Sequence, residues 1–373
     1  MFSHFWPRRV RLVSGLVLFA FVAGHLLNLS LGLASVALIE QGRRLLLAPW
    51  QTAAGQALLL AAALAHTALG LASLATRRSL AMSRTDWVQL TLGLATPPLL
   101  LAHVVSLQVL SDVDRAFAGD YRFVLAAYWI AAPRLALQQL LVILVVWAHG
   151  AIGLTSVLVL KRSWPRLAPL IIPLLFAVPI TALLGFAAAG EEVLSRLPSD
   201  PQWQARFAAS LAVLQAQRAW LDGVENLVFI GYGAAVLAAV TVLAARVLRR
   251  RARRVPVRFE DGRAASGRVG QSVLDVSRSH GIPHAHVCSG RGRCGTCMII
   301  VTDAAALDRI GPVETETLAR VHAPAEARLA CQAHLIGPPL AVRRVFPAYA
   351  DAALARRESD LAAVPGNCLP AAR

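Results

Sequence analysis

The sequence predicts a membrane α-helical bundle of six transmembrane helices followed by a small cytoplasmic α+β domain. Three observations lead to this fold class. Of the 373 residues, 57% are hydrophobic and only 16% are charged, which is not the composition of a soluble protein. Six apolar runs are each long enough to cross a bilayer. After the last run the chain becomes mixed in character, and all five cysteines lie in this final part.

The apolar runs define an expected membrane domain over residues 1–254. A transmembrane helix needs about 20 predominantly apolar residues, and each run meets that length. We expect a second domain over residues 255–347 and a flexible tail over 348–373, in which the fifth cysteine, Cys368, has no role that the sequence supports. In order, the six runs are Leu12–Leu38, Thr52–Ala75, Trp87–Leu110, Leu135–Leu160, Leu167–Ala189 and Val224–Val247.

Basic residues predict the orientation of the bundle. Arginine and lysine gather before the first run, between the second and third, between the fourth and fifth, and after the sixth. Cytoplasmic loops carry such an excess, so both termini are expected in the cytoplasm of a bacterium, with the bundle in the inner membrane. Arg43 and Arg44, in the first outer loop, are the exception. The net charge of +16 therefore reflects orientation in a lipid bilayer, and nucleic acid is excluded as a partner.

The loop before the sixth run is also patterned. Leucines recur along one face of Ala208–Leu221, which predicts an amphipathic helix lying on the outer membrane surface.

Each of the first four runs contains one histidine, and the last two contain none. These residues are His25, His66, His103 and His149. An ionisable side chain in hydrocarbon is costly and is retained for a reason. A single one usually serves as a hydrogen-bonding contact between helices, and a proton relay is another use. Four in successive helices, each flanked by small residues, favour axial ligation of two b-type haems.

Depth in the membrane suggests how the histidines pair. With a helical rise of about 1.5 Å per residue, His66 and His149 lie at similar distances from the cytoplasmic ends of their runs. The expected pairs are therefore His66 with His149 towards the cytoplasm and His25 with His103 towards the outside. Pro97 and Pro98 make the depth of His103 less certain, because proline kinks a helix.

Four cysteines form the densest chemical pattern in the chain. Cys288, Cys294 and Cys297 lie in C-S-G-R-G-R-C-G-T-C, and Cys331 follows in R-L-A-C-Q. Disulfides are unfavourable in the reducing cytoplasm, and structural zinc usually has two C-x2-C pairs or a Cys/His mixture. Four thiolates separated by glycines favour a [2Fe–2S] cluster. Cys288 and Cys294 are expected at one iron, with Cys297 and Cys331 at the other.

Residues from about 255 to 345 resemble a [2Fe–2S] ferredoxin domain. The resemblance rests on F-E-D-G, G-Q-S-V-L-D-V and the two cysteine segments, and the five-residue first gap is similar to the adrenodoxin-like branch. It implies a β-grasp fold, a small mixed sheet with a helix across it. The expected elements are a hairpin of Val257–Phe259 and Ala264–Arg268, a helix over Ser272–His280, a strand Met298–Val301, a helix opened by Pro312, and strands Arg328–Gln332 and Leu340–Val345.

The five histidines of this second domain lie in polar surroundings. We expect them at the surface, and they are His280, His284, His286, His322 and His334.

The histidine pattern of the first domain resembles the cytochrome b membrane anchors of succinate dehydrogenase and fumarate reductase. In those anchors alternate helices supply the axial ligands of two haems. The sixth run and the fused ferredoxin depart from that pattern. An anchor followed by a ferredoxin is similar to the N-terminal part of bacterial membrane-bound class III adenylate cyclases, in which a cyclase domain comes after the ferredoxin, but we expect no cyclase activity from the residues of this sequence.

The combination predicts a membrane-bound electron-transfer protein that passes electrons between two b haems and a cytoplasmic [2Fe–2S] cluster. The alternative is a redox-sensing regulatory module of a nucleotide cyclase-type signalling system. In a third interpretation the histidines only join helices. No catalytic nucleophile, P-loop or dinucleotide motif is found in the sequence, so no self-contained catalytic site is expected.

The outer end of the sixth run carries polar residues that bear on a quinone donor or acceptor. Asp222, Glu225 and Asn226 are candidates to handle its protons, and helix capping is their simpler use. A cytoplasmic redox or signalling partner and the oligomeric state are left open.

Overall fold

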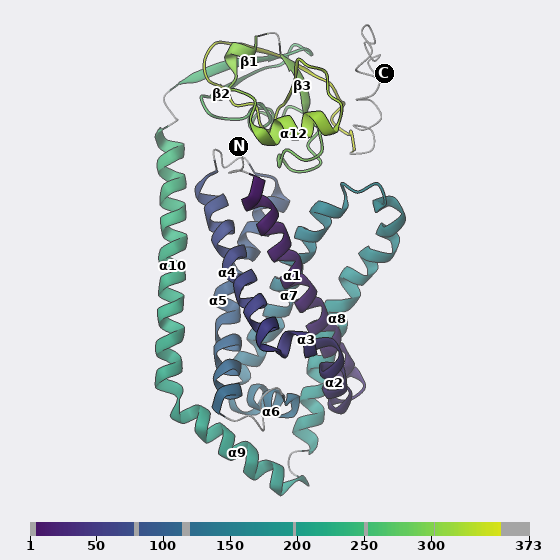
Figure 1. Cartoon of the computed structure of the whole chain (residues 1–373), viewed down its shortest axis with the longest axis vertical. Helices are drawn as coiled ribbons and strands as arrows, with labels where there is room; N and C mark the ends of the chain where they lie inside the picture. Colours follow the sequence, from purple (N-terminus) through teal and green to yellow (C-terminus); the bar gives the residue numbers. More distant parts are fainter. Residues whose placement is uncertain are drawn as a thin grey trace.

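A computed structural model shows an elongated molecule in which a helical bundle carries a small α/β domain at one end (Figure 1). The structure describes residues 5–77, 82–113, 120–196, 199–249, 253–301 and 303–351. The tail expected to be flexible, with Cys368, lies outside the described residues apart from its first few positions. We call the end of the bundle that faces the α/β domain the domain end, and the opposite end the far end.

Six long helices form the bundle. Each has the length and apolar composition of a membrane span, so the chain is a multi-pass membrane protein, as predicted. The shortest has 23 residues and the longest 33, and at about 1.5 Å per residue all exceed the roughly 30 Å of bilayer hydrocarbon. They are α1 (Phe5–Ser30), α4 (Ala53–Ala75), α5 (Arg84–Val113), α7 (Pro133–Leu158), α8 (Trp164–Arg196) and α10 (Arg218–Arg249).

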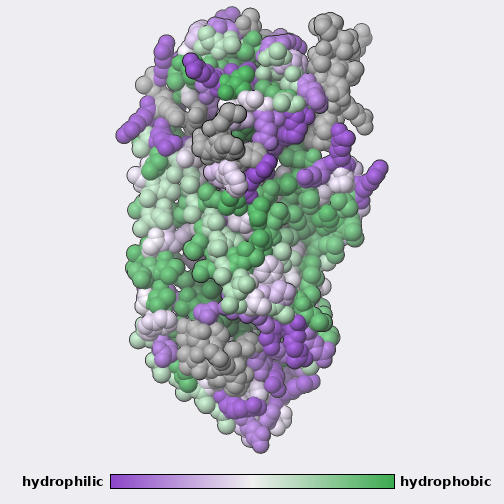
Figure 2. Space-filling model, viewed as in Figure 1, coloured by the Kyte–Doolittle hydropathy of each residue, from purple (hydrophilic) through white to green (hydrophobic). Residues whose placement is uncertain are grey.

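The hydropathy of the surface follows the same division. Figure 2 shows a continuous hydrophobic band around the middle of the visible face, with hydrophilic residues gathered at both ends. Large apolar side chains are exposed along this band, such as Phe176 on α8 and Leu227 on α10. Because lipid tails are as apolar as these side chains, such exposure is expected of a membrane surface.

The far end contains more helical structure than the sequence suggested. The first span ends at Ser30 and not at Leu38, because Ser35 begins a separate helix by accepting a hydrogen bond from the backbone N–H of Leu38. A chain of short helices then fills the connection to α4: η1 (Leu31–Leu33), α2 (Val36–Gly42), η2 (Arg43–Leu47) and α3 (Ala48–Gln51). Between α5 and α7 lie α6 (Tyr121–Ala126) and η3 (Ala127–Ala131).

A helix occupies the region where we expected an amphipathic helix, with shifted bounds, and its position on the membrane surface stays a prediction. It is α9 (Pro201–Ala216), and α10 begins immediately after it at Arg218, so the segment up to Leu221 belongs to the sixth long helix. Asp200 sets the start of α9, since its carboxylate accepts from the backbone N–H of Trp203. Capping chemistry, which leucine spacing does not reveal, therefore decides the boundaries.

Prolines inside two spans create points of attachment between helices. Pro179 in α8 lacks the N–H that would pair with the carbonyl of Leu175, and the indole Nε1 of Trp147 donates to that oxygen at 2.6 Å. Likewise Pro98 in α5 leaves the carbonyl of Leu94 unpaired within the helix.

The hydroxyl of Tyr232 on α10 donates to the Leu94 carbonyl at 2.9 Å. Backbone groups in hydrocarbon must be satisfied, so these side chains join α7 to α8 and α10 to α5.

The α/β domain contains a five-stranded mixed sheet in the order β2-β1-β5-β3-β4. Strand β1 pairs antiparallel with β2 and parallel with β5, while β3 pairs antiparallel with both β5 and β4. The strands are β1 (Arg254–Phe259), β2 (Ala264–Arg268), β3 (Met298–Val301), β4 (Ala327–Leu329) and β5 (Leu340–Arg344); the helices are α11 (Val273–Ser279) and α12 (Pro312–Arg320), with a short η5 (Ala304–Ala306).

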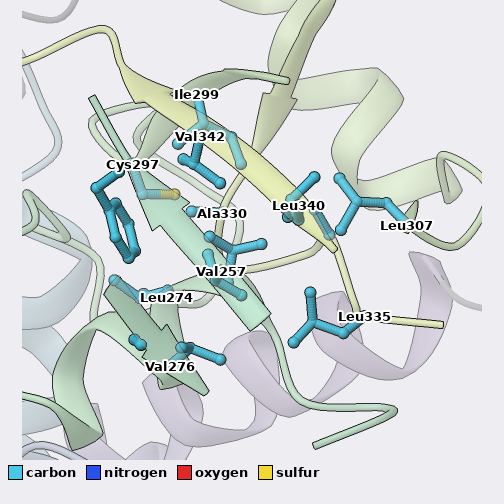
Figure 3. Packing of buried hydrophobic residues seen from close by; sticks show 14 of the residues in the cluster. Val257, Leu274, Val276, Cys297, Ile299, Leu307, Ala330, Leu335, Leu340 and Val342 are labelled. Atoms are coloured by element: carbon cyan, nitrogen blue, oxygen red, sulfur yellow. The ribbon is translucent and has the colours of Figure 1, made fainter. Parts of the chain in front are cut away.

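The larger of two apolar clusters among the described residues forms the main core of this domain. Alternate residues of β1 face inward, including Val255 and Val257, and Leu274 of α11 packs among them. Figure 3 shows Cys297 within this core, beside Ala330. The fold is the expected mixed sheet with a helix across it, and the strand before the fourth cysteine is shorter than predicted, ending at Leu329.

A glycine contact between α1 and α8 gives the first testable prediction. A Cβ at Gly185 would lie 2.2 Å from the backbone oxygen of Leu29, so Gly185→Ala should force the helices apart and cost about 1–3 kcal/mol. The measurement is thermal unfolding of the purified protein in detergent. Gly231→Ala on α10 is the matched control, because its Cβ meets nothing within 4 Å. Equal melting temperatures for both variants would contradict this packing.

Candidate functional site

The cysteine loop follows α11 and precedes β3, and its backbone needs glycine. Gly290, Gly292 and Gly295 all have positive φ, at 80°, 62° and 81°, a conformation that other residues adopt at a cost. The neighbourhood is also tight, since a Cβ at Gly292 would lie 2.8 Å from the side chain of Val313. The small residues between the cysteines therefore let the chain curl within a confined space.

The loop folds the four cysteines into two pairs of buried, free thiols. Cys288, Cys294, Cys297 and Cys331 are 3%, 5%, 1% and 7% exposed. The thiols of Cys288 and Cys294 are within hydrogen-bonding range of each other, and so are those of Cys297 and Cys331. These are the two pairs that the spacing predicts for two irons.

Nearby donors favour a negative charge on the sulfur of Cys288, whereas the pKa of its partner Cys294 is raised by the hydrogen bond with Cys288 and by burial. The hydrogen bond with Cys294 and backbone N–H groups, including that of Arg293 at 3.4 Å, lower the pKa of Cys288 to about 5. The pKa of Cys297 is raised, by its hydrogen bond with Cys331 and by burial. Thr296 adds a hydroxyl 3.0 Å from the sulfur of Cys294. The thiolate is the form that binds iron.

Residues of the second half of the α/β domain hold the cysteine loop in place by hydrogen bonds. The hydroxyl of Thr317 on α12 donates to the carbonyl of Gly292 at 2.6 Å, and the amide of Gln332 donates to the carbonyl of Gly290 at 3.3 Å. Gln332 also lies 3.5 Å from the sulfur of Cys331. These bonds hold the loop against the segment that supplies the fourth cysteine.

A buried ion pair positions that segment. Glu314 of α12 accepts from the guanidinium of Arg328 at 2.9 and 3.1 Å and from the backbone N–H of Leu329 at 2.7 Å. Both side chains are almost fully buried, and such a bidentate pair has fixed geometry. The end of β4, two residues before Cys331, is thereby tied to α12.

The chemistry of the donor set fits a two-iron cluster, because all four buried donors are cysteine thiols. Two thiol pairs side by side suit two irons bridged by sulfide.

The histidines of the bundle also form two pairs. The ring centroids of His66 and His149 are 6.1 Å apart, and those of His25 and His103 are 6.2 Å apart. These are the pairs predicted from depth. The first lies towards the domain end, on α4 and α7, and the second towards the far end, on α1 and α5.

Every histidine in the two pairs has a hydrogen-bonding partner at Nδ1. His66 meets the carbonyl of Arg11 at 3.1 Å, and His149 meets the carbonyl of Gln89 at 3.0 Å. In the other pair the partners are tyrosine hydroxyls: Tyr128 at 2.8 Å from His103, and Tyr121 at 3.4 Å from His25. An Nδ1–H that donates to oxygen orients the ring and leaves Nε2 available as a ligand.

Glycines give the domain-end histidines room. A Cβ at Gly15 would lie 2.8 Å from Cε1 of His66, and one at Gly93 would lie 2.7 Å from Cε1 of His149. The small residues around the histidines therefore admit the imidazoles themselves.

One sequence expectation changes in the structure, and another is not tested by it. His284 is buried, at 5% exposed, where we expected a surface residue; its Nδ1 is 3.0 Å from the hydroxyl of Ser277, and burial lowers its pKa to about 4. Asp222 pairs with Arg218 one turn earlier on α10 at 3.0 Å, a bond within the helix. A quinone at this end stays a prediction.

Comparison with known families agrees with the geometry of the cysteine site. The family described as the 2Fe-2S iron-sulfur cluster binding domain matches residues 259–335, a span that includes all four buried cysteines. No curated protein matches the chain. The chain therefore carries a [2Fe–2S] ferredoxin domain after its six apolar helices, and this domain points to iron–sulfur electron transfer.

The buried ion pair gives a prediction for this site. Glu314→Ala leaves Arg328 buried and frees the end of β4, which should destabilise the domain by about 3 kcal/mol. The iron and acid-labile sulfide per protein should fall with it, as measured by chemical analysis and by the EPR signal of the reduced protein. Glu316→Ala, an exposed position on the same helix, should retain both. Full cluster content in Glu314→Ala would show that this pair does not support the site.

Proposed function

We propose that the protein transfers electrons across the membrane between two b-type haems, held by His66/His149 and His25/His103, and a [2Fe–2S] cluster held by Cys288, Cys294, Cys297 and Cys331. The observation that carries the proposal is the spacing of the histidine pairs. Two imidazoles on opposite sides of one iron have ring centroids roughly 6.3 Å apart, given metal–nitrogen bonds of about 2.0 Å. The observed values are 6.1 and 6.2 Å.

The hydrogen bonds at Nδ1 support ligation over a merely structural role. Histidines that only join helices would be expected to bond to one another or to a neighbouring helix through either nitrogen. Here all four use Nδ1 for an oxygen partner, which leaves the Nε2 atoms for the space between the rings.

The residues around the two histidine pairs and the cysteines have distinct roles. When bound, the haems and the cluster supply one-electron redox chemistry. The carbonyls of Arg11 and Gln89 fix the rings of the domain-end pair, and Tyr121 and Tyr128 fix those of the far-end pair. The backbone N–H groups around Cys288 stabilise sulfur charge, and the apolar core around Cys297 excludes water.

The order of the sites along the molecule supports a linear path. The α/β domain contacts the domain end of the bundle, where Arg291 of the cysteine loop bonds to Asp86 of α5. From that end of the molecule, the order of the sites is therefore the cluster, the His66/His149 pair and the His25/His103 pair. With the domain end in the cytoplasm, as the arginines favour, the path runs from the inner to the outer surface of the bacterial inner membrane.

Substitution of the histidines tests the haem assignment. His66→Ala or His149→Ala should remove one of two haems, halving the Soret absorbance per protein, while the EPR signal of the cluster persists. His280→Ala, on an exposed histidine of the ferredoxin domain, should change neither. Wild-type protein from cells with ample haem that shows cluster iron and sulfide but no porphyrin would exclude the proposal.

Kinetics test the electron transfer itself. After a sub-stoichiometric pulse of reductant, the EPR signal of the cluster and the optical bands of the haems should relax to a common equilibrium in a concentration-independent step. In the control, a soluble redox dye carries electrons between molecules and brings all centres to equilibrium. Reduction levels that never reach the equilibrium distribution established with the dye would show that no intramolecular path exists.

A further inference from the structure

One side chain of the cysteine loop reaches into the bundle. Arg291, between Cys288 and Cys294, donates through Nη2 to Oδ1 of Asp86 and to Oε1 of Gln89, each at 3.0 Å. Both partners lie in the first turns of α5. Asp86 is 7% exposed, and its second oxygen accepts from the hydroxyl of Ser83 at 2.6 Å. The carboxylate is therefore held in place before Arg291 meets it.

One of these partners, Gln89, also contacts a domain-end histidine, and a neighbouring segment of α1 contacts the other. Gln89 binds Arg291 through its side chain, while its backbone carbonyl is 3.0 Å from Nδ1 of His149. On α1, Arg8 donates to the carbonyl of Arg291 at 3.4 Å, and one turn later the carbonyl of Arg11 is 3.1 Å from Nδ1 of His66. Both rings of this pair are thus oriented by helix segments that touch or adjoin Arg291.

Asp86 is the counter-charge of Arg291, because several other charged side chains close to this contact are arginines. Arg8 and Arg293 lie close to Arg291, and the pKa of Arg293 is lowered by burial and then by the positive charges of Arg291 and Arg8. Arg77, at the end of α4, also has a lowered pKa, with burial as the larger cause and Asp86 acting in the opposite direction. Without the carboxylate, the cysteine loop and the bundle would present like charges to each other.

We propose that Arg291, through Asp86 and Gln89, is the positioning residue that holds the cluster loop against the His66/His149 pair for electron exchange. This inference rests on the proposed function. One electron moves per exchange: the cluster is oxidised by one electron as one haem is reduced by one, or the reverse. Arg291 remains a cation throughout and transfers no proton. Its Nη2 donates to two oxygens on one helix, and the planar guanidinium differs in shape and reach from a lysine ammonium, so lysine restores the charge without the same geometry.

The test uses the full-length protein with both cofactors in detergent or nanodiscs, and follows cluster-to-haem electron exchange by rapid mixing. Arg291→Ala and Asp86→Asn should each slow the exchange by roughly tenfold, because each removes one partner of a partly buried charge pair. The Soret absorbance and the cluster EPR signal per protein should stay unchanged. The double variant should be no slower than the slower single variant, since both remove the same contact.

Two further variants separate positioning from a change in driving force. Arg291→Lys keeps the charge beside the cluster, so it should keep the midpoint potential and recover part of the rate. Arg263→Ala removes an arginine whose ion pair with Asp261 lies within the same domain, and it should exchange electrons at the wild-type rate.

The outcomes distinguish this inference from the function on which it rests. Wild-type exchange with an unchanged rate in both Arg291→Ala and Asp86→Asn would overturn the positioning role alone. No exchange in the wild type would overturn the electron-transfer proposal and the positioning role together. If Arg291→Ala loses its cluster, Asp86→Asn decides the matter, because that substitution lies in the bundle.

Discussion

The structure depends on one constraint: a polar group within hydrocarbon must find its partner inside the protein. The four histidines meet it with Nδ1 bonds to carbonyls or tyrosine hydroxyls. The carbonyls that Pro98 and Pro179 leave unpaired meet it with Tyr232 and Trp147. Each solution joins two helices, so the requirement that satisfies single groups also determines which helices are neighbours and at what depth.

The ferredoxin domain also buries polar groups, the four cysteine sulfurs, and satisfies them with different partners. Its four sulfurs are buried in a domain that has its own apolar core, and burial of charge is tolerable only with nearby donors. Backbone N–H groups, Thr296 and Gln332 provide them. The buried pair of Glu314 and Arg328 then keeps the strand before Cys331 in register with α12. Long-range contacts thus complete a site that three cysteines within ten residues begin.

Much of this organisation was predictable because it follows simple periodicities. Apolar length predicts the six spans, and rise per residue predicts which histidines share a depth; the structure brings those pairs together. The spacing of the cysteines likewise predicts which thiols adjoin. These features depend on distance along the chain, which a sequence states directly.

The remaining features depend on individual hydrogen bonds, some local and some between distant residues, that neither apolar length nor residue spacing reveals. The break at Ser35 and the start of α9 are decided by side-chain caps, and the burial of His284 by the packing of its loop against Ser277. The bond of Arg291 to Asp86 joins residues 205 positions apart, and nothing in either local sequence identifies the other. A loop arginine next to a cluster ligand was recognisable, but its partner was not.

The short connection between α10 and β1 has a consequence for access to the cysteine site of the ferredoxin domain. This helix stands at the side of the bundle (Figure 1), meets α5 through Tyr232, and ends at Arg249, with β1 beginning at Arg254. The connection between them is short, because a chain spans at most about 3.6 Å per residue. The ferredoxin domain is therefore held at a roughly millimolar effective concentration beside its own bundle. Any soluble redox partner of the cluster would therefore compete with the bundle of the same molecule, which is always close to the domain.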